Sequence, residues 1–296
     1  MALTVYVRSK SRFARRMLWH RLRGQPRVCP YCGTSSSVRF LQRKKIIMDI
    51  LECAECHLIF RWPQDTEAEL DVHYQNQYAV DFPQVRLPDP KTLPALEAEN
   101  FVSWFGPDLK HKIEIIKMIR PAGRILDYGC SWGYASCLLR QSGYSVMGLE
   151  ISKPRAAYAR EHLGLHAIDS VEAIEALPAG SFDIIYSNHV LEHLPSIGRV
   201  LASFARLLAP DGITINALPN FLGNVRRTGM WLYLIGEDHP IAPGVEFFKK
   251  ALPAAGLSRF AFASSPYDAG TIAAMTSCSG QTSQLDGDEL LFVAQK

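Results

Sequence analysis

Apolar and polar residues follow two different rhythms along this chain, and the rhythm changes near Leu109. From there onward, short apolar runs that end in a polar residue alternate with stretches that have the apolar spacing of a helix. We expect strands over residues 124–127, 145–150, 165–169, 181–188, 213–217 and 289–294, and helices over 135–141 and 195–208. Strands and helices that alternate in this way are typical of a parallel α/β sheet.

The first 108 residues lack this alternation and divide into three segments. Residues 1–27 are rich in arginine, and residues 28–62 hold two pairs of cysteines. Residues 63–108 mix prolines, acids and aromatics without a long period, which is typical of a connector with short helices. We therefore place the domain boundary in this connector and expect one α/β domain over residues 109–296.

Residues 1–27 are predicted to form a basic arm. Met17, Leu18 and Leu22 recur at helical spacing among the arginines, which predicts a short basic amphipathic helix. Residues 1–48 hold twelve Lys and Arg and no acid, whereas the rest of the chain holds twenty basic and twenty-nine acidic residues. Such an arm can pack on the protein's own acidic body, contact RNA or a membrane surface, or be a cleaved targeting peptide.

The overall composition is that of an ordinary globular protein, with 48% hydrophobic and 21% charged residues. No apolar run approaches the roughly 18 residues that a membrane-spanning helix needs. The first residues also lack the apolar core of a secretory signal. We therefore expect a soluble, cytoplasmic protein.

Four of the seven cysteines form two CxxC pairs, Cys29 with Cys32 and Cys53 with Cys56, separated by twenty residues. This is the ligand spacing of a two-knuckle zinc site, and it suits a reducing compartment better than disulfides do. Four thiolates leave no position for a catalytic water, so we expect a structural zinc ion. The metal would stabilise a segment too small for a core of its own, by up to about 10 kcal/mol.

A glycine-rich turn follows the first strand of the α/β half, where Asp127 precedes Gly129 and Gly133. The glycines allow the backbone to pass close to a ligand, and Glu150, at the end of the next strand, can accept both hydroxyls of a ribose. Asp169, at the end of the third strand, can accept a hydrogen bond from the amino group of adenine. Together these residues indicate a cofactor that contains a nucleoside.

The charge at the turn favours S-adenosylmethionine over a dinucleotide. Ser131 and Trp132 fill the space that a GxGxxG turn leaves for a pyrophosphate. The carboxylate of Asp127 would repel phosphate, whereas it would attract the ammonium and sulfonium groups of S-adenosylmethionine.

These motifs, in this order, resemble those of the class I S-adenosylmethionine-dependent methyltransferases. The resemblance covers residue 110 to the end and includes FDIIYSNHVLEH at 182–193 and LLAPDG at 207–212. It implies methyl transfer on a Rossmann-like fold with a mostly parallel, seven-stranded sheet and helices on both faces. The donor-binding residues that it implies are Asp127, Gly129, Cys130, Gly133, Glu150, Asp169 and Asn188. Ser131 stands where the family usually has glycine.

The front half, with CPYC at 29–32 and LECAECHLIF at 51–60, resembles a bacterial subfamily in which a zinc ribbon precedes the methyltransferase domain. Members of that subfamily often act on sugars or other small metabolites. The resemblance therefore implies a small-molecule acceptor, such as a sugar or a polysaccharide precursor.

His189, Glu192 and His193 form an HxxEH sequence, which some zinc peptidases also contain. Here the motif begins at the end of a strand in a nucleotide-binding array, so an acid-base role fits better. An oxygen acceptor must lose its proton as the methyl group moves, and imidazole suits that task. His189 is the first candidate because it directly follows Asn188, and His193 and His239 are its rivals.

Three other functions account for parts of the sequence. An RNA methyltransferase would grip RNA with the zinc ribbon and the basic arm, although few aromatic residues accompany the basic ones. A nicotinamide oxidoreductase would use the glycine-rich turn for its own cofactor. A zinc-dependent scaffold would bind the cofactor without turnover.

Overall fold

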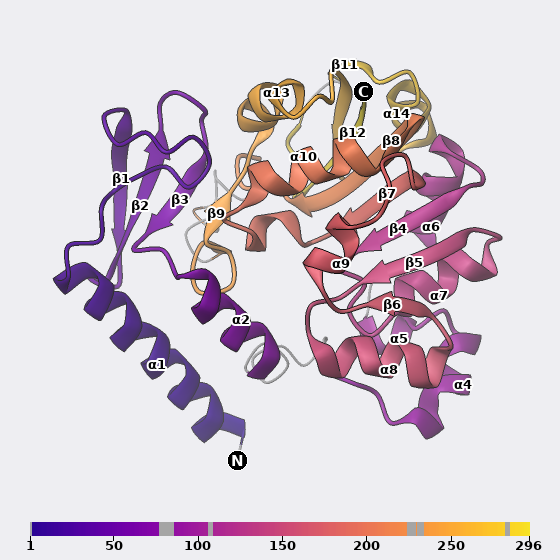
Figure 1. The fold of residues 1–296 in the computed structure, drawn as a ribbon, viewed down its shortest axis with the longest axis horizontal. Helices are drawn as coiled ribbons and strands as arrows, with labels where there is room; N and C mark the ends of the chain where they lie inside the picture. The colour runs from indigo at the N-terminus through magenta and orange to yellow at the C-terminus, as the bar shows by residue number, and fades with distance from the viewer. Residues whose placement is uncertain (1, 77–85, 106–108, 224–228, 230–233, 282–284) are drawn as a thin grey trace.

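A computed structural model of the chain describes residues 2–76, 86–105, 109–223, 229, 234–281 and 285–296. Two sheets of unequal size organise these residues (Figure 1). The smaller sheet lies beside the N-terminal helix at the left of Figure 1, and the larger sheet forms the centre of the rest. Parts of the predicted connector, residues 77–85 and 106–108, lie outside the described residues.

The large sheet has eight strands in the order β11-β10-β12-β8-β7-β4-β5-β6. Their bounds are β4 (Arg124–Tyr128), β5 (Ser145–Leu149), β6 (His166–Ile168), β7 (Phe182–Asn188), β8 (Leu208–Pro219), β10 (Arg259–Ser264), β11 (Ser279–Gln281) and β12 (Glu289–Gln295). Strands β6, β5, β4, β7 and β8 are parallel, whereas β12 is antiparallel to both of its neighbours. The predicted mostly parallel sheet is confirmed, and β11 adds a short edge strand to the expected seven.

Helices cover both faces of this sheet, as predicted. One face packs against α6 (Leu109–Ile119), α7 (Tyr134–Gln141), α8 (Lys153–Leu163) and α14 (Ala269–Met275). The other packs against α9 (Val171–Glu175), α10 (Ile197–Leu207) and α13 (Val245–Ala254). In α10, Ile197, Val200, Leu201 and Phe204 are buried at the spacing of a single helix face, which explains why this segment forms a helix against the sheet.

The small sheet combines residues from both halves of the chain. Strands β1 (Val38–Lys44), β2 (Met48–Cys53) and β3 (Ile59–Trp62) are antiparallel neighbours, and β9 (Ile241–Ala242) pairs with β3. Segment 28–62 therefore does not build its sheet alone. Two residues are too few for a periodic pattern, so β9 could not be predicted from the pattern of apolar residues.

Helix α1 (Ala2–Leu22) confirms the predicted basic helix, and only part of its apolar stripe is buried. Phe13 and Met17 are buried and pack against Met48, whereas Leu18 and Leu22 are 45% and 78% exposed. The position of the small sheet selects this face, because Met48 lies at the start of β2. Of the three apolar residues at helical spacing, Met17 therefore packs on the body, whereas Leu18 and Leu22 do not.

The connector holds three helices, α2 (Glu67–Asn76), α4 (Leu93–Ala98) and α5 (Val102–Phe105), and a 3-10 helix η2 (Pro90–Thr92). Gln75, near the end of α2, bonds the carbonyl oxygen of Ile151 and the amide of Lys153. The connector therefore lies against the edge of the sheet where β5 ends. Within the described residues, no helix combines the length and the apolarity needed to cross a membrane.

Candidate active site

The turn after β4 has the backbone that its glycines permit. Gly129 and Gly133 have φ of 85° and 100°, in the left-handed region that favours glycine. A Cβ atom at Gly129 would lie 2.4 Å from Val190, and one at Gly133 would lie 2.4 Å from Leu165. The protein's own packing against this turn thus requires both glycines, in addition to any close approach of a ligand.

Ser131 also lies in the left-handed region, with φ of 53°, which explains why the related family usually has glycine there. Its hydroxyl is buried and has no hydrogen-bond partner among the described residues. Cys130 is buried, and its backbone amide donates to the carbonyl of Leu149. The Trp132 side chain is fully buried against Phe101 and so closes the back of the turn.

Two buried carboxylates flank the turn. Asp127 is 2% exposed and accepts a hydrogen bond from the Ser136 hydroxyl at 2.6 Å. Burial raises the pKa of Asp127 to about 7, and the charge of Glu150 adds to the rise, although the Ser136 hydrogen bond opposes it. Glu150 is 7% exposed and accepts from the Ser152 amide at 2.7 Å. Burial raises its pKa as well.

Asp169 and Asn188 occupy strand ends, as predicted. Asp169 follows β6, and its side chain is 36% exposed, 3.2 Å from the guanidinium of Arg160. Asn188 ends β7, and its Oδ1 accepts from Lys112 Nζ at 2.5 Å. The side chains predicted to hold the donor therefore lie along the carboxyl edge of the parallel strands, where α/β sheets bind ligands.

The three candidate histidines meet around one buried carboxylate. Glu192, in the 3-10 helix η3 (Leu191–His193), is fully buried and has Oε1 3.4 Å from His189 Nδ1 and 3.9 Å from His193 Nε2. The His193 ring centroid is 4.6 Å from that of His239. His239 Nδ1 lies 2.9 Å from the carbonyl oxygen of Leu234. The sequence predicted these histidines as rivals, and the structure places them in one cluster.

The HxxEH sequence does not form the helical motif of a zinc peptidase. It begins directly after β7, with His189 at a φ of 53°, and ends in the three-residue helix η3. Glu192, His193 and His239 offer donor atoms within 4.8 Å of one another, which is compact enough for a metal ion. In this structure, however, the cationic neighbour nearest to Glu192 is His189.

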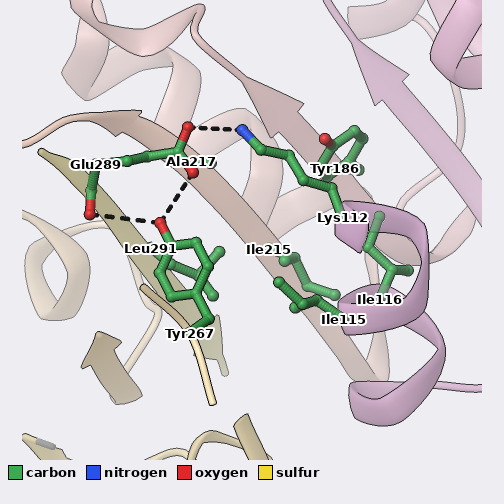
Figure 2. Close-up of a pocket in the computed structure, with 9 residues that line it drawn as sticks. All are labelled: Lys112, Ile115, Ile116, Tyr186, Ile215, Ala217, Tyr267, Glu289 and Leu291. Atoms are coloured by element: carbon green, nitrogen blue, oxygen red, sulfur yellow. Dashed lines mark hydrogen bonds and ion pairs between the residues drawn. The ribbon is translucent and has the colours of Figure 1, made fainter. Parts of the chain in front are cut away.

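Glu289 is a functional candidate that sequence reasoning missed. Its Oε2 lies 2.7 Å from His189 Nε2 and 2.6 Å from Lys112 Nζ, and its Oε1 accepts from the Tyr267 hydroxyl at 2.9 Å. Figure 2 shows Lys112, Tyr267 and Glu289 converging at one end of a small cleft. The walls of the cleft are mainly apolar and come from α6, β8 and β12.

The carboxylates set the protonation of the histidines. Burial alone would lower the pKa of His189, but its interactions with Glu192 and Glu289 outweigh burial and raise the pKa to about 9. His193 has the opposite shift, because burial and the nearby His239 lower its pKa to about 4. His189 is therefore the cation of the cluster at neutral pH, and His193 is neutral.

The four cysteines of the predicted zinc site come together at one end of the small sheet. Sγ atoms of Cys29 and Cys56 are 3.5 Å apart, as are those of Cys32 and Cys53, and all four lie within 4.8 Å of one another. Ligands about 2.3 Å from a tetrahedral zinc ion are about 3.8 Å from each other. The arrangement therefore fits a Cys₄ zinc site.

Residues 126–216 match the family described as a methyltransferase domain. The matched segment runs from β4 into β8 and includes the glycine-rich turn, both buried carboxylates, and His189 and His193. The chain contains a class I methyltransferase domain.

Relatives and solved structures agree with this assignment. A ubiquinone biosynthesis O-methyltransferase of Nitrosococcus oceani is 35% identical over 106 residues, which are 32% of this chain and 45% of that protein. A probable S-adenosylmethionine-dependent methyltransferase of Mycolicibacterium smegmatis is 28% identical over 171 residues, 57% of this chain and 60% of that protein. The chain thus spans about half the length of the curated relatives it matches.

The same fold occurs in a solved structure from Thermotoga maritima, described as an S-adenosylmethionine-dependent methyltransferase and possible histamine N-methyltransferase. It has a TM-score of 0.50 and 16% identity, and the match covers 70% of this chain and 97% of that one. The likeness supports the methyltransferase fold.

Proposed function

We propose that this protein transfers a methyl group from S-adenosylmethionine to an oxygen atom of a small molecule. The observation that carries the proposal is the pair of buried carboxylates, Asp127 and Glu150, at the ends of adjacent strands β4 and β5. Burying two acids costs free energy unless a ligand offsets it. A cationic ligand with two ribose hydroxyls would offset it at both positions.

Each residue has a defined task toward this donor. Asp127 would attract its charged amino-acid end, and Glu150 would accept from the ribose hydroxyls. Asp169 would accept from the adenine amino group, because its pair with Arg160 is exposed and easily opened. When bound, S-adenosylmethionine supplies an electrophilic methyl group, and the residues of the chain hold it in position for an in-line displacement.

An oxygen acceptor is supported by the names of several relatives, which are O-methyltransferases. A hydroxyl is a weak nucleophile until its proton is removed, and His189 is the candidate base. Glu289 orients its ring through Nε2 at 2.7 Å. His189 is protonated at neutral pH in the free protein, so it would act as a base most readily above about pH 9, or beside a positively charged donor that lowers its pKa.

The acceptor itself is proposed as a sugar, a polysaccharide precursor or another hydroxyl-bearing metabolite. RNA is a weaker proposal. Several arginines that could have gripped RNA are paired with the protein's own acids, Arg16 with Asp65 at 2.5 Å and Arg21 with Asp49 at 3.2 Å.

A structural zinc ion belongs to the same proposal. Cys29, Cys32, Cys53 and Cys56 would hold it as a closed thiolate site, with no position left for a substrate. Its task would be to stabilise the small sheet.

Calorimetric titration tests the donor assignment directly. S-adenosylmethionine and its demethylated product should bind at micromolar concentrations, whereas NAD should not, because Asp127 disfavours a pyrophosphate. Tight binding of NAD would overturn the proposal, and so would failure of both S-adenosylmethionine and its demethylated product to bind.

A further inference from the structure

The outward face of helix α1 is both basic and apolar. Leu18, Trp19 and Leu22 are 45%, 49% and 78% exposed, respectively. Arg12 and Arg15 on the same helix, and Arg23 in the turn that ends it, are also exposed. The Arg23 guanidinium lies 4.2 Å from the centroid of the Trp19 ring. Exposed leucines beside an exposed tryptophan cost free energy in water, so this face has the character of a binding surface.

The opposite face of α1 is fixed to the body. Phe13 and Met17 are buried, Arg16 bonds Asp65 at 2.5 Å, and His20 lies 2.9 Å from Glu69. These contacts set the rotation of the helix, so its outward residues cannot turn into the core. The apolar outward face is thus a property of the folded protein.

The charge of the outward face is one-sided. The first 48 residues contain no acid, and the acids that reach α1 from elsewhere, such as Asp65 and Glu69, meet its inward face. The outward arginines therefore present uncompensated positive charge to whatever binds there.

We propose that this face of α1 docks on the surface of an anionic phospholipid bilayer. A helix with arginines beside tryptophan and leucine lies in the plane of the interface, with its apolar side chains between the headgroups and acyl chains. The arginines would bind lipid phosphates, and each adds about fivefold to the affinity. Nucleic acid would satisfy the arginines but would leave Leu18 and Leu22 exposed to water, so the lipid surface accounts for both features.

Flotation of the full-length protein with vesicles tests the proposal. The protein should bind vesicles of phosphatidylcholine with 30% phosphatidylglycerol, and hardly bind pure phosphatidylcholine. The triple variant Leu18→Ser, Trp19→Ser, Leu22→Ser should lose at least tenfold in binding, because the apolar contact is gone. A second triple variant, of Arg12, Arg15 and Arg23 to Gln, should lose about a hundredfold and its preference for anionic lipid.

Met118→Ser is the matched control, because Met118 is 47% exposed on α6, in the methyltransferase domain. It should bind vesicles as the natural protein does, and all variants should keep their circular dichroism and their affinity for S-adenosylmethionine. The proposal is overturned if anionic vesicles are not bound at low salt, or if the serine variant binds as tightly as the natural protein. It is equally overturned if the serine substitutions convert a dimer into a monomer, which would make a second copy the occupant. Because donor binding is measured separately, failure of lipid docking leaves the proposed methyl transfer intact.

Discussion

Protonation of Asp127 should control the affinity for S-adenosylmethionine. In the free protein, burial raises the pKa of this carboxyl to about 7, so it is partly protonated at neutral pH. The bound donor has a net positive charge and prefers the ionised carboxylate. Donor binding should therefore weaken as the pH falls through 7, in contrast to a carboxylate of ordinary pKa, which would stay ionised down to about pH 4.

The size of the effect follows from the pKa of Asp127. With a pKa of about 7, the carboxylate is about nine-tenths ionised at pH 8 and about 3% ionised at pH 5.5. If only the ionised form binds the donor, the dissociation constant should rise about 30-fold over this interval, which is about 2 kcal/mol. The raised pKa of Glu150 acts in the same direction.

The stability of the free protein should depend on the protonation of Asp127 as well, but with a pH trend opposite to that of donor affinity. The folded-state pKa of Asp127 lies above the value near 3.9 of an unfolded aspartate, so the folded state binds the proton more tightly. This contribution is present at low pH and is lost as the pH rises through about 7. The rise in melting temperature caused by S-adenosylmethionine should consequently be larger at pH 8 than at pH 5.5.

Calorimetric titrations between pH 5.5 and 8 provide the measurement. Asp127→Asn should bind the donor more weakly at pH 8 and with little pH dependence, whereas Glu172→Gln, at an exposed carboxylate on α9, should behave as the natural protein. A dissociation constant that stays within threefold across the range would refute the reasoning. So would an Asp127→Asn variant that keeps the full pH dependence.

Four further predictions concern the other proposed sites. Metal analysis should find one zinc ion per chain. Cys53→Ser should lose the zinc and melt at a lower temperature, whereas Cys278→Ser, at a buried thiol outside the cluster, should keep it. A Cys53→Ser protein with full zinc content would contradict the site. Glu150→Ala should weaken S-adenosylmethionine binding about 30-fold or more, since the ribose hydroxyls lose a charged acceptor, and unchanged affinity would remove Glu150 from the donor site. With the acceptor identified, His189→Ala should lower turnover about a hundredfold with donor affinity within a few fold. Full turnover in His189→Ala would show that positioning alone suffices. In the natural protein, the acid limb of the pH profile of turnover is expected toward pH 9. In Glu289→Gln this limb should move to lower pH, because a carboxylate that raises the pKa of His189 is gone.

The sequence was most informative where function depends on the ends of parallel strands. Asp127, Glu150 and Asn188 could be located because each ends a predicted strand, and parallel strands bring such ends to one edge. The local glycine pattern predicted the turn after β4 in the same way. What the pattern did not reveal is that Gly129 is required by the protein's own Val190.

Glu289 shows why other parts of the site escaped sequence reasoning. It lies 100 residues from His189 and 177 from Lys112, so no local spacing joins them. Its one sequence signal is its position as the first residue of a last strand that runs antiparallel to its neighbours. The start of such a strand meets the carboxyl ends of the parallel ones, and that reasoning could have identified it.

The small sheet also contributes to the site, through the loop at residues 234–240. Lys44 Nζ donates to the carbonyl of Ile235 at 2.5 Å, and the buried Arg61 donates to those of Gly236 and Pro240. The same loop carries His239, whose ring packs beside His193. A zinc ion at the cysteines would thus hold β2 and β3 in place, and these strands would in turn hold one wall of the histidine cluster. Loss of zinc should therefore affect turnover through the position of His239 and leave the donor contacts of Asp127 unchanged, because the amides of Gly129 and Cys130 in the glycine-rich turn are held by the carbonyl of Leu149 at the end of β5.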